Sequence, residues 1–95
     1  MIAQLEQRMR LRDEDYQELE RDVAEVETLR QYAQSTQDPN SRFQYFEQIR
    51  TLSARYGVSC GPTDINCQLA GLGQLLASER QLRQQRDVYN RRNCL

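Results

Sequence analysis

The chain has no histidine and no tryptophan, and because lysine is also missing, its 13 basic residues are all arginine. Without histidine it lacks the side chain that most often acts as a general base near neutral pH. No serine or cysteine stands beside a base, and no glycine-rich phosphate loop follows a strand. The sequence therefore predicts a non-enzymatic protein with no catalytic residue and no cofactor.

Apolar residues are also scarce. They make up 38% of the 95 residues, and the mean hydropathy is -0.90. No run approaches the ~20 apolar residues of a membrane span, and the N-terminus lacks the apolar segment of a signal peptide. We expect one helical domain over residues 1–95 with a thin core, or a fragment of a longer anchored or exported protein.

A heptad repeat opens the chain. Eight of its ten seam positions are apolar, and Arg12 and Arg30 are the breaks. The a positions are Ile2, Met9, Tyr16, Val23 and Arg30, and the d positions are Leu5, Arg12, Leu19, Val26 and Ala33. This spacing predicts a helix over about residues 2–35 that lies along another helix.

Two more helices are predicted, over about 40–56 and 63–92. The first is expected to begin with Asp38 as N-cap and Pro39 at the first helical position, or with Ser41 as N-cap, and to end at Gly57. Thr63 or Asp64 would cap the last helix. The fold class is thus all-α.

Charge separates the two halves of the sequence. Residues 1–38 carry a net charge of -5 and residues 39–95 a net charge of +4. In a parallel pair of the first helix, Asp15 would face Glu20 and Asp22 would face Glu27, which disfavours self-pairing. We therefore expect the first helix to pack on the arginine-rich last helix, as an antiparallel helical hairpin or a three-helix bundle with coiled-coil character.

Cysteine is the most distinctive chemical group in the chain. Cys60 and Cys67 are predicted to form a disulfide that closes a short loop, and the alternative is free thiols in a cytosolic protein. Cys94 would then be left unpaired, either as an exposed thiol able to join two chains or as a disordered terminal thiol. Three cysteines without histidine match no zinc pattern, so we expect no metal. Cys60-Gly61-Pro62-Thr63 lacks the second cysteine of a thioredoxin-type motif.

Several positions are candidates for an interaction surface. The second helix is the most aromatic part of the chain, and Phe43, Tyr45 and Phe46 form either a packing face or an exposed docking surface. Gly71 and Gly73 belong to a small-residue patch where another helix could approach or where the last helix bends. Arg83 and Arg86 complete the predicted surface. The last helix lacks the aromatic interleaving of nucleic-acid readers, so we expect no nucleic-acid partner.

The final segment, Leu82 to Leu95, reads Leu-Arg-Gln-Gln-Arg-Asp-Val-Tyr-Asn-Arg-Arg-Asn-Cys-Leu. This segment resembles the end of phage inner-membrane spanins. The resemblance covers the last third of the chain. It implies a periplasmic coiled coil with an earlier cysteine near a loop and a near-terminal cysteine that links chains. The N-terminal membrane anchor of that family is absent from these 95 residues.

The sequence as a whole predicts a helical protein–protein interaction or assembly module of a bacterial or phage extracytoplasmic, periplasmic complex. Its partner would be another protein or a second copy, reached through helix packing. The competing hypothesis is a cytoplasmic adaptor, similar to a secretion chaperone, or a nucleic-acid-associated regulator.

Overall fold

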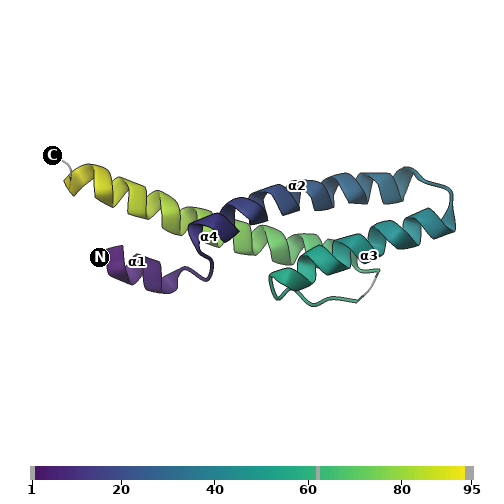
Figure 1. Ribbon diagram of the computed structural model, residues 1–95, viewed down its shortest axis with the longest axis horizontal. Coiled ribbons are helices and arrows are strands. Elements are labelled where there is room, and N and C mark those ends of the chain that lie inside the picture. Colours follow the sequence, from purple (N-terminus) through teal and green to yellow (C-terminus); the bar gives the residue numbers. More distant parts are fainter. Residues whose placement is uncertain (1, 62, 94–95) are drawn as a thin grey trace.

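The computed structural model describes residues 2–61 and 63–93, with the side chain of Asn93 excepted. These residues form four helices: α1 (Ile2–Arg8), α2 (Asp13–Ser35), α3 (Pro39–Arg55) and α4 (Ile65–Asn93). They build a rod of 58 × 21 × 18 Å (Figure 1). The all-helical class is confirmed, but the described part of the chain has four helices where three were predicted.

The additional helix arises because the predicted helix over 2–35 is interrupted at residues 9–12. Arg12 occupies a d position of the heptad, and in the structure its side chain is 81% exposed and outside the seam. Three acidic residues, Asp13, Glu14 and Asp15, fill the first turn of α2, where the helix dipole favours negative charge. The prediction of one continuous helix was therefore wrong at the point where the repeat itself is broken.

Helices α2 and α3 form an antiparallel hairpin with a short turn. Asp38 is the N-cap of α3, since its Oδ1 accepts a hydrogen bond from the Asn40 amide at 3.2 Å, and Pro39 follows at the first helical position. The alternative N-cap, Ser41, lies inside the first turn and donates its hydroxyl to Asp38 at 2.9 Å. Gly57 follows the helix with a φ of 75°, as predicted for a residue that ends a helix.

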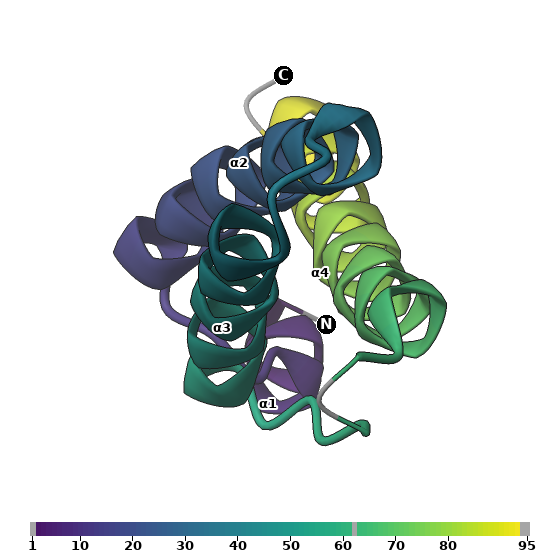
Figure 2. The same ribbon diagram turned by 90° about the vertical axis from the view of Figure 1, so that its right-hand side faces the viewer.

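The long helix α4 runs from beside the hairpin toward the opposite end of the rod (Figure 1). It begins at Ile65, two residues later than predicted, and the Asp64 carboxylate accepts from the Cys67 amide at 3.1 Å. Its first half packs beside the hairpin and its second half runs antiparallel to α1 (Figures 1 and 2). The turn between α2 and α3 projects beyond the start of α4 (Figure 1).

The core is a single seam between α2, α3 and α4. Its buried members are Leu19, Val26, Leu29, Ile49, Leu72 and Leu75. On α2 the heptad d positions are buried, but the a positions Tyr16 and Val23 are only half-buried. The g positions Asp22 and Leu29 are buried in their place. The helix thus presents a d/g face to its neighbours, rotated from the predicted a/d face.

Candidate functional site

A groove lies between α1 and the second half of α4. It has a volume of about 430 Å³ and is lined mostly by apolar atoms. Its lining residues are Leu5, Gln81, Gln84, Gln85, Val88, Tyr89 and Arg92. The groove exists because the short helix α1 covers only part of the apolar face of α4.

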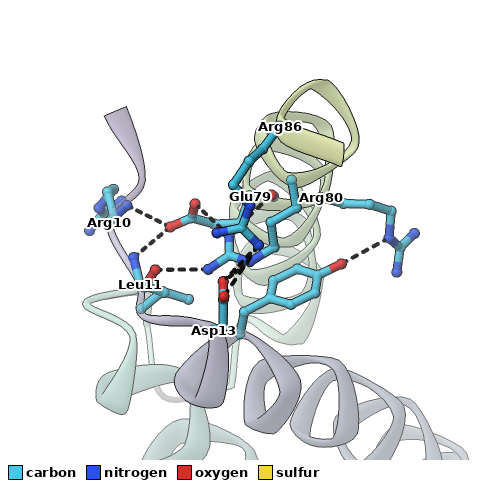
Figure 3. A network of polar contacts seen from close by, with 8 residues as sticks. Arg10, Leu11, Asp13, Glu79, Arg80 and Arg86 are labelled. Carbon is cyan, nitrogen blue, oxygen red and sulfur yellow. Dashed lines mark hydrogen bonds and ion pairs between the residues drawn. The ribbon is translucent and has the colours of Figure 1, made fainter. Parts of the chain in front are cut away.

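The position of α1 depends on the break in the helix before α2, which is formed by the non-helical residues 9–12. Two amides of the break, those of Arg10 and Leu11, each donate to Oε1 of Glu79 at 2.7 Å (Figure 3). Since the helix is interrupted there, these amides have no helical carbonyl to bind, and the carboxylate from α4 satisfies both. Glu79 is 1% exposed, so a buried carboxylate holds residues 10 and 11 of the break against α4.

Arg83 compensates the buried charge of Glu79. Its Nη1 donates to Oε2 of Glu79 at 3.2 Å, and its Nη2 donates to the Leu11 carbonyl at 2.8 Å. Its Nε reaches the Asp13 carboxylate at 3.0 Å, and its guanidinium lies 4.3 Å from the centre of the Tyr16 ring. One arginine therefore joins α4, the break and the start of α2.

Two further arginines extend this network toward solvent. Arg86 donates to both Asp13 oxygens at 3.2 and 3.3 Å, and Arg80 donates to the Tyr16 hydroxyl at 3.3 Å (Figure 3). Arg80 also lies 3.7 Å from Glu20. These contacts join the acidic first half to the basic last helix, which is the packing that the charge pattern predicts. The network has no free nucleophile or base, and its role is to hold α1 and α2 against α4.

A second polar pair, partly buried, joins α2 to the C-terminal end of α3. The Tyr56 hydroxyl donates to Oδ2 of Asp22 at 2.5 Å, and Arg55 lies 3.9 Å from the same oxygen. Burial raises the pKa of Tyr56 above its ordinary value of 10.0, and the hydrogen bond to the Asp22 carboxylate raises it further. Asp22 occupies a heptad g position, and the Tyr56 hydroxyl satisfies its buried carboxylate there.

The predicted cysteine pair brings the loop before α4, with Cys60, against the first turn of α4, with Cys67. The sulfur atoms of Cys60 and Cys67 lie 2.01 Å apart, at the distance of a disulfide. The side-chain amide of Gln68 donates to the Gly61 carbonyl at 3.2 Å and holds the same loop. Cys94, the predicted intermolecular thiol, lies outside the described residues.

The predicted glycine patch has a different neighbour from the one expected. A side chain at Gly71 would meet Cγ1 of Val58 at 2.8 Å, so this glycine admits the loop after α3 and not another helix. Gly73 faces open space. Only one of the two glycines therefore serves close packing.

The predicted aromatic and arginine positions separate into exposed and interior groups. Phe43 is 64% exposed, while Phe46 and Tyr45 are half-buried, and Tyr45 packs against the core and the Tyr32 ring. Arg86 is half-buried on Asp13. Arg83 is a correction to the predicted surface, because it is 7% exposed and its donors are engaged inside the molecule.

Sequence reasoning missed Glu79 and the lining of the groove. Glu79 looks like an ordinary acid on a polar helix, since its partners lie 68 and 69 residues away in the sequence. A signal for the break was present in Arg12, which interrupts the heptad directly before three acidic residues. Val88 and Tyr89 lie near the end of the last predicted helix, and nothing in their spacing indicates a groove.

Two other features of the described residues concern metal binding and membrane insertion. No group of three or more His, Cys, Asp or Glu side chains in that part of the chain could hold a metal ion. No helix within the same residues is long and apolar enough to cross a membrane.

Comparison with known proteins gave no relative. No protein-family model, no curated protein and no solved structure matches this chain. The groove and its supporting network are therefore the basis for a functional proposal.

Proposed function

We propose that this protein is a non-enzymatic helical interaction module of an extracytoplasmic assembly, and that its binding site is the groove between α1 and α4. The observation that carries the proposal is the groove itself, a recess of about 430 Å³ with Leu5, Val88 and Tyr89 in its lining. Helical surfaces of this kind accept an apolar side chain or the apolar face of a partner helix.

The setting of the groove supports a binding role. Polar contacts fix α1 beside α4, above all the two hydrogen bonds from backbone amides to Glu79. The recess is therefore formed before a partner arrives. A preformed recess binds with a smaller loss of conformational entropy than one assembled on contact. Glutamines and Arg92 around the apolar lining supply hydrogen-bond donors and acceptors at the rim.

The proximity of Cys60 and Cys67 supports the compartment in this proposal. Disulfides persist in oxidising compartments such as the periplasm and are rare in the cytosol. We expect protein isolated from its source under thiol-blocking conditions to contain the Cys60–Cys67 bond. Mass spectrometry of the peptides will test it, and finding both thiols alkylated would remove the extracytoplasmic part of the proposal.

Photo-crosslinking in the source cell tests the groove. A photoreactive phenylalanine analogue replaces Val88, which is 47% exposed, and in a control chain it replaces Ala77, an exposed residue of the same helix outside the groove. We expect an adduct of one defined mass at position 88 and none at position 77. Equal labelling at both positions, or none at 88, would refute a binding role for the groove.

A further inference from the structure

The neighbours of α4 change along the rod. Beside the hairpin, α4 packs with two helices, α2 and α3, around the core. Toward the opposite end, α3 does not extend, and α2 touches α4 only through its first turns, as in the contact of Asp13 with Arg86 (Figure 1). We call α1 and residues 84–93 the groove end. The groove is lined by α1 and α4 alone among the described residues, so it lies on a side of α4 that no described helix covers.

The side chains that α4 contributes to the groove form a stripe of helical spacing. Separated by three and four residues, they are Gln81, Gln84, Gln85, Val88, Tyr89 and Arg92. All except Tyr89 are exposed. The stripe is about 16 Å long, since a helix rises about 1.5 Å per residue. Side chains at this spacing interlock with those of a second helix that lies along the first, whereas an extended strand presents every second residue. The stripe therefore fits a partner helix of about three turns.

The charges at the groove end restrict the kind of helix that fits. The groove lining contains Arg92 and no acidic residue. The two acids of the groove end line other recesses: Glu6 lies in one that includes Asp13, and Asp87 lies in one that includes Glu20. Both acids are therefore on the side of α2, and neither neutralises the groove.

Several arginines at the groove end are without a carboxylate partner. At mid-rod the arginines of α4 are each paired: Arg80 with Glu20, Arg83 with Asp13 and Glu79, and Arg86 with Asp13. Arg8, Arg91 and Arg92 are exposed and form no ion pair within the described part of the chain. Arg8 follows Leu5 by one turn of α1, and Arg92 belongs to the lining itself. The rim of the groove is therefore complementary to carboxylates.

We infer that the groove receives an acidic amphipathic helix of a different protein. The apolar stripe of that helix faces Leu5, Val88 and Tyr89, and its Asp and Glu side chains reach Arg8 and Arg92 at the rim. This inference rests on the proposed function, because it names the class of partner for the same groove. A second copy of this chain does not offer such a helix, since its acidic helix, α2, already buries its apolar face in its own core.

Selection from a displayed library of random peptides tests the inference, with the full chain as target. Peptides of about 16 residues allow about four helical turns. A second round removes those that also bind Val88→Glu, which places a charge in the groove. We expect the remaining peptides to be net negative, with apolar residues at spacings of three and four. Remaining peptides that are neutral or basic, or whose apolar residues alternate, would overturn the inference, as would a selection in which none remain.

The affinity of one selected peptide then separates the apolar contact from the charge. We expect Val88→Glu to weaken binding at least about tenfold and Arg92→Glu about fivefold, the latter effect shrinking at high salt. Ala77→Glu on α4 and Arg21→Glu on α2 make the same charge changes at exposed positions outside the groove, and each should change the Kd by less than about twofold. Circular dichroism will verify that all four variants fold. Equal weakening by Arg92→Glu and Arg21→Glu would show only a general effect of net charge and would overturn the assignment.

The photo-crosslinking experiment distinguishes failure of this inference from failure of the proposed function. A photoreactive side chain at position 88 reacts with any occupant of the groove, whatever its charge. Mass spectrometry then locates the crosslinked residue in the partner. A site in a basic segment, in a segment without helical apolar spacing, or in a second copy of this chain would overturn the inference and leave the groove as a binding site. Absence of an adduct at position 88 would remove both.

Discussion

Glu79 is the residue on which the shape of the groove end depends. Its carboxylate accepts hydrogen bonds from the two amides of the helix break and from the guanidinium of Arg83, and almost none of it is exposed. A buried ion pair contributes little by comparison with a well-packed apolar pair, but removing one member leaves an uncompensated charge. The main effect of the network is therefore to fix the position of the break between α1 and α2, and its net contribution to the free energy of unfolding is smaller than that of an apolar pair.

We expect Glu79→Leu to lower the free energy of unfolding by about 3 kcal/mol, since Arg83 and two amides then lose their buried acceptor. Urea denaturation followed by circular dichroism will measure it. The control, Glu25→Leu at an exposed position of α2, should cost less than about 0.5 kcal/mol. Adding Arg83→Leu to Glu79→Leu should recover part of the loss, and strictly additive costs would contradict the coupling between the two residues.

Tyr56 gives the molecule a sensitivity to alkaline pH. Its pKa is raised above 10.0 by burial and by its bond to Asp22, so above pH 10 the folded state holds a proton that the unfolded state releases. Stability from this pair is complete below pH 10 and is lost as the pH rises further. We expect Tyr56→Phe to cost about 2 kcal/mol at pH 7 and progressively less above pH 10.

The measurement is the urea midpoint of native and Tyr56→Phe chains between pH 7 and pH 11, with free thiols alkylated beforehand. Tyr32→Phe is the matched control, because Tyr32 is 51% exposed. A difference between native chain and Tyr56→Phe that stays constant across this pH range would show that the hydroxyl proton is not linked to folding.

At the level of single elements, the two glycines of α4 allow a matched comparison. Gly73 faces open space in the helix, so Gly73→Ala should raise the free energy of unfolding by about 1 kcal/mol through helix propensity alone. Gly71→Ala gains the same propensity, but its new carbon meets Val58 at 2.8 Å, and a branched side chain moves away only at a cost.

We therefore expect Gly71→Ala to destabilise the protein by about 1 kcal/mol, and Val58→Ala in the same chain to relieve the clash. The comparison is made by thermal unfolding of four chains: the native chain, Gly73→Ala, Gly71→Ala, and Gly71→Ala combined with Val58→Ala. If Gly71→Ala were as stabilising as Gly73→Ala, the loop after α3 would not pack on α4 as described.

The ends of the elements were largely predictable because their signals are local. Asp38 with Pro39 starts α3 and Gly57 ends it, and each acts through groups only a few residues away. The break before α2 was not predictable in the same way. Its decisive partner is Glu79, which meets the free amides only after α4 has folded back along α1.

The face that α2 buries also escaped prediction, for a reason of geometry. A heptad pattern assumes one partner helix, whereas α2 packs against both α3 and α4. Packing against two neighbours rotates the buried face, so that Leu29 and Asp22, and not Tyr16 and Val23, are buried beside Leu19 and Val26. Asp22 is tolerated there because Tyr56 supplies a hydrogen bond.

At the scale of the whole molecule, elongation is the main property. The Cα radius of gyration is 16.4 Å, whereas a compact domain of this length would have one of about 12 Å. A thin rod buries a smaller share of its apolar surface than a sphere. The scarcity of apolar residues in the sequence agrees with this shape, because a thin rod has little interior to fill.

Small-angle X-ray scattering of a dilute solution tests the rod shape. At low concentration the native chain should scatter as a rod of about the described dimensions, 58 × 21 × 18 Å. Its radius of gyration should exceed the about 12 Å of a compact domain of this length, because α1 and the second half of α4 extend away from the hairpin. A value near 12 Å would contradict the elongated arrangement of the four helices.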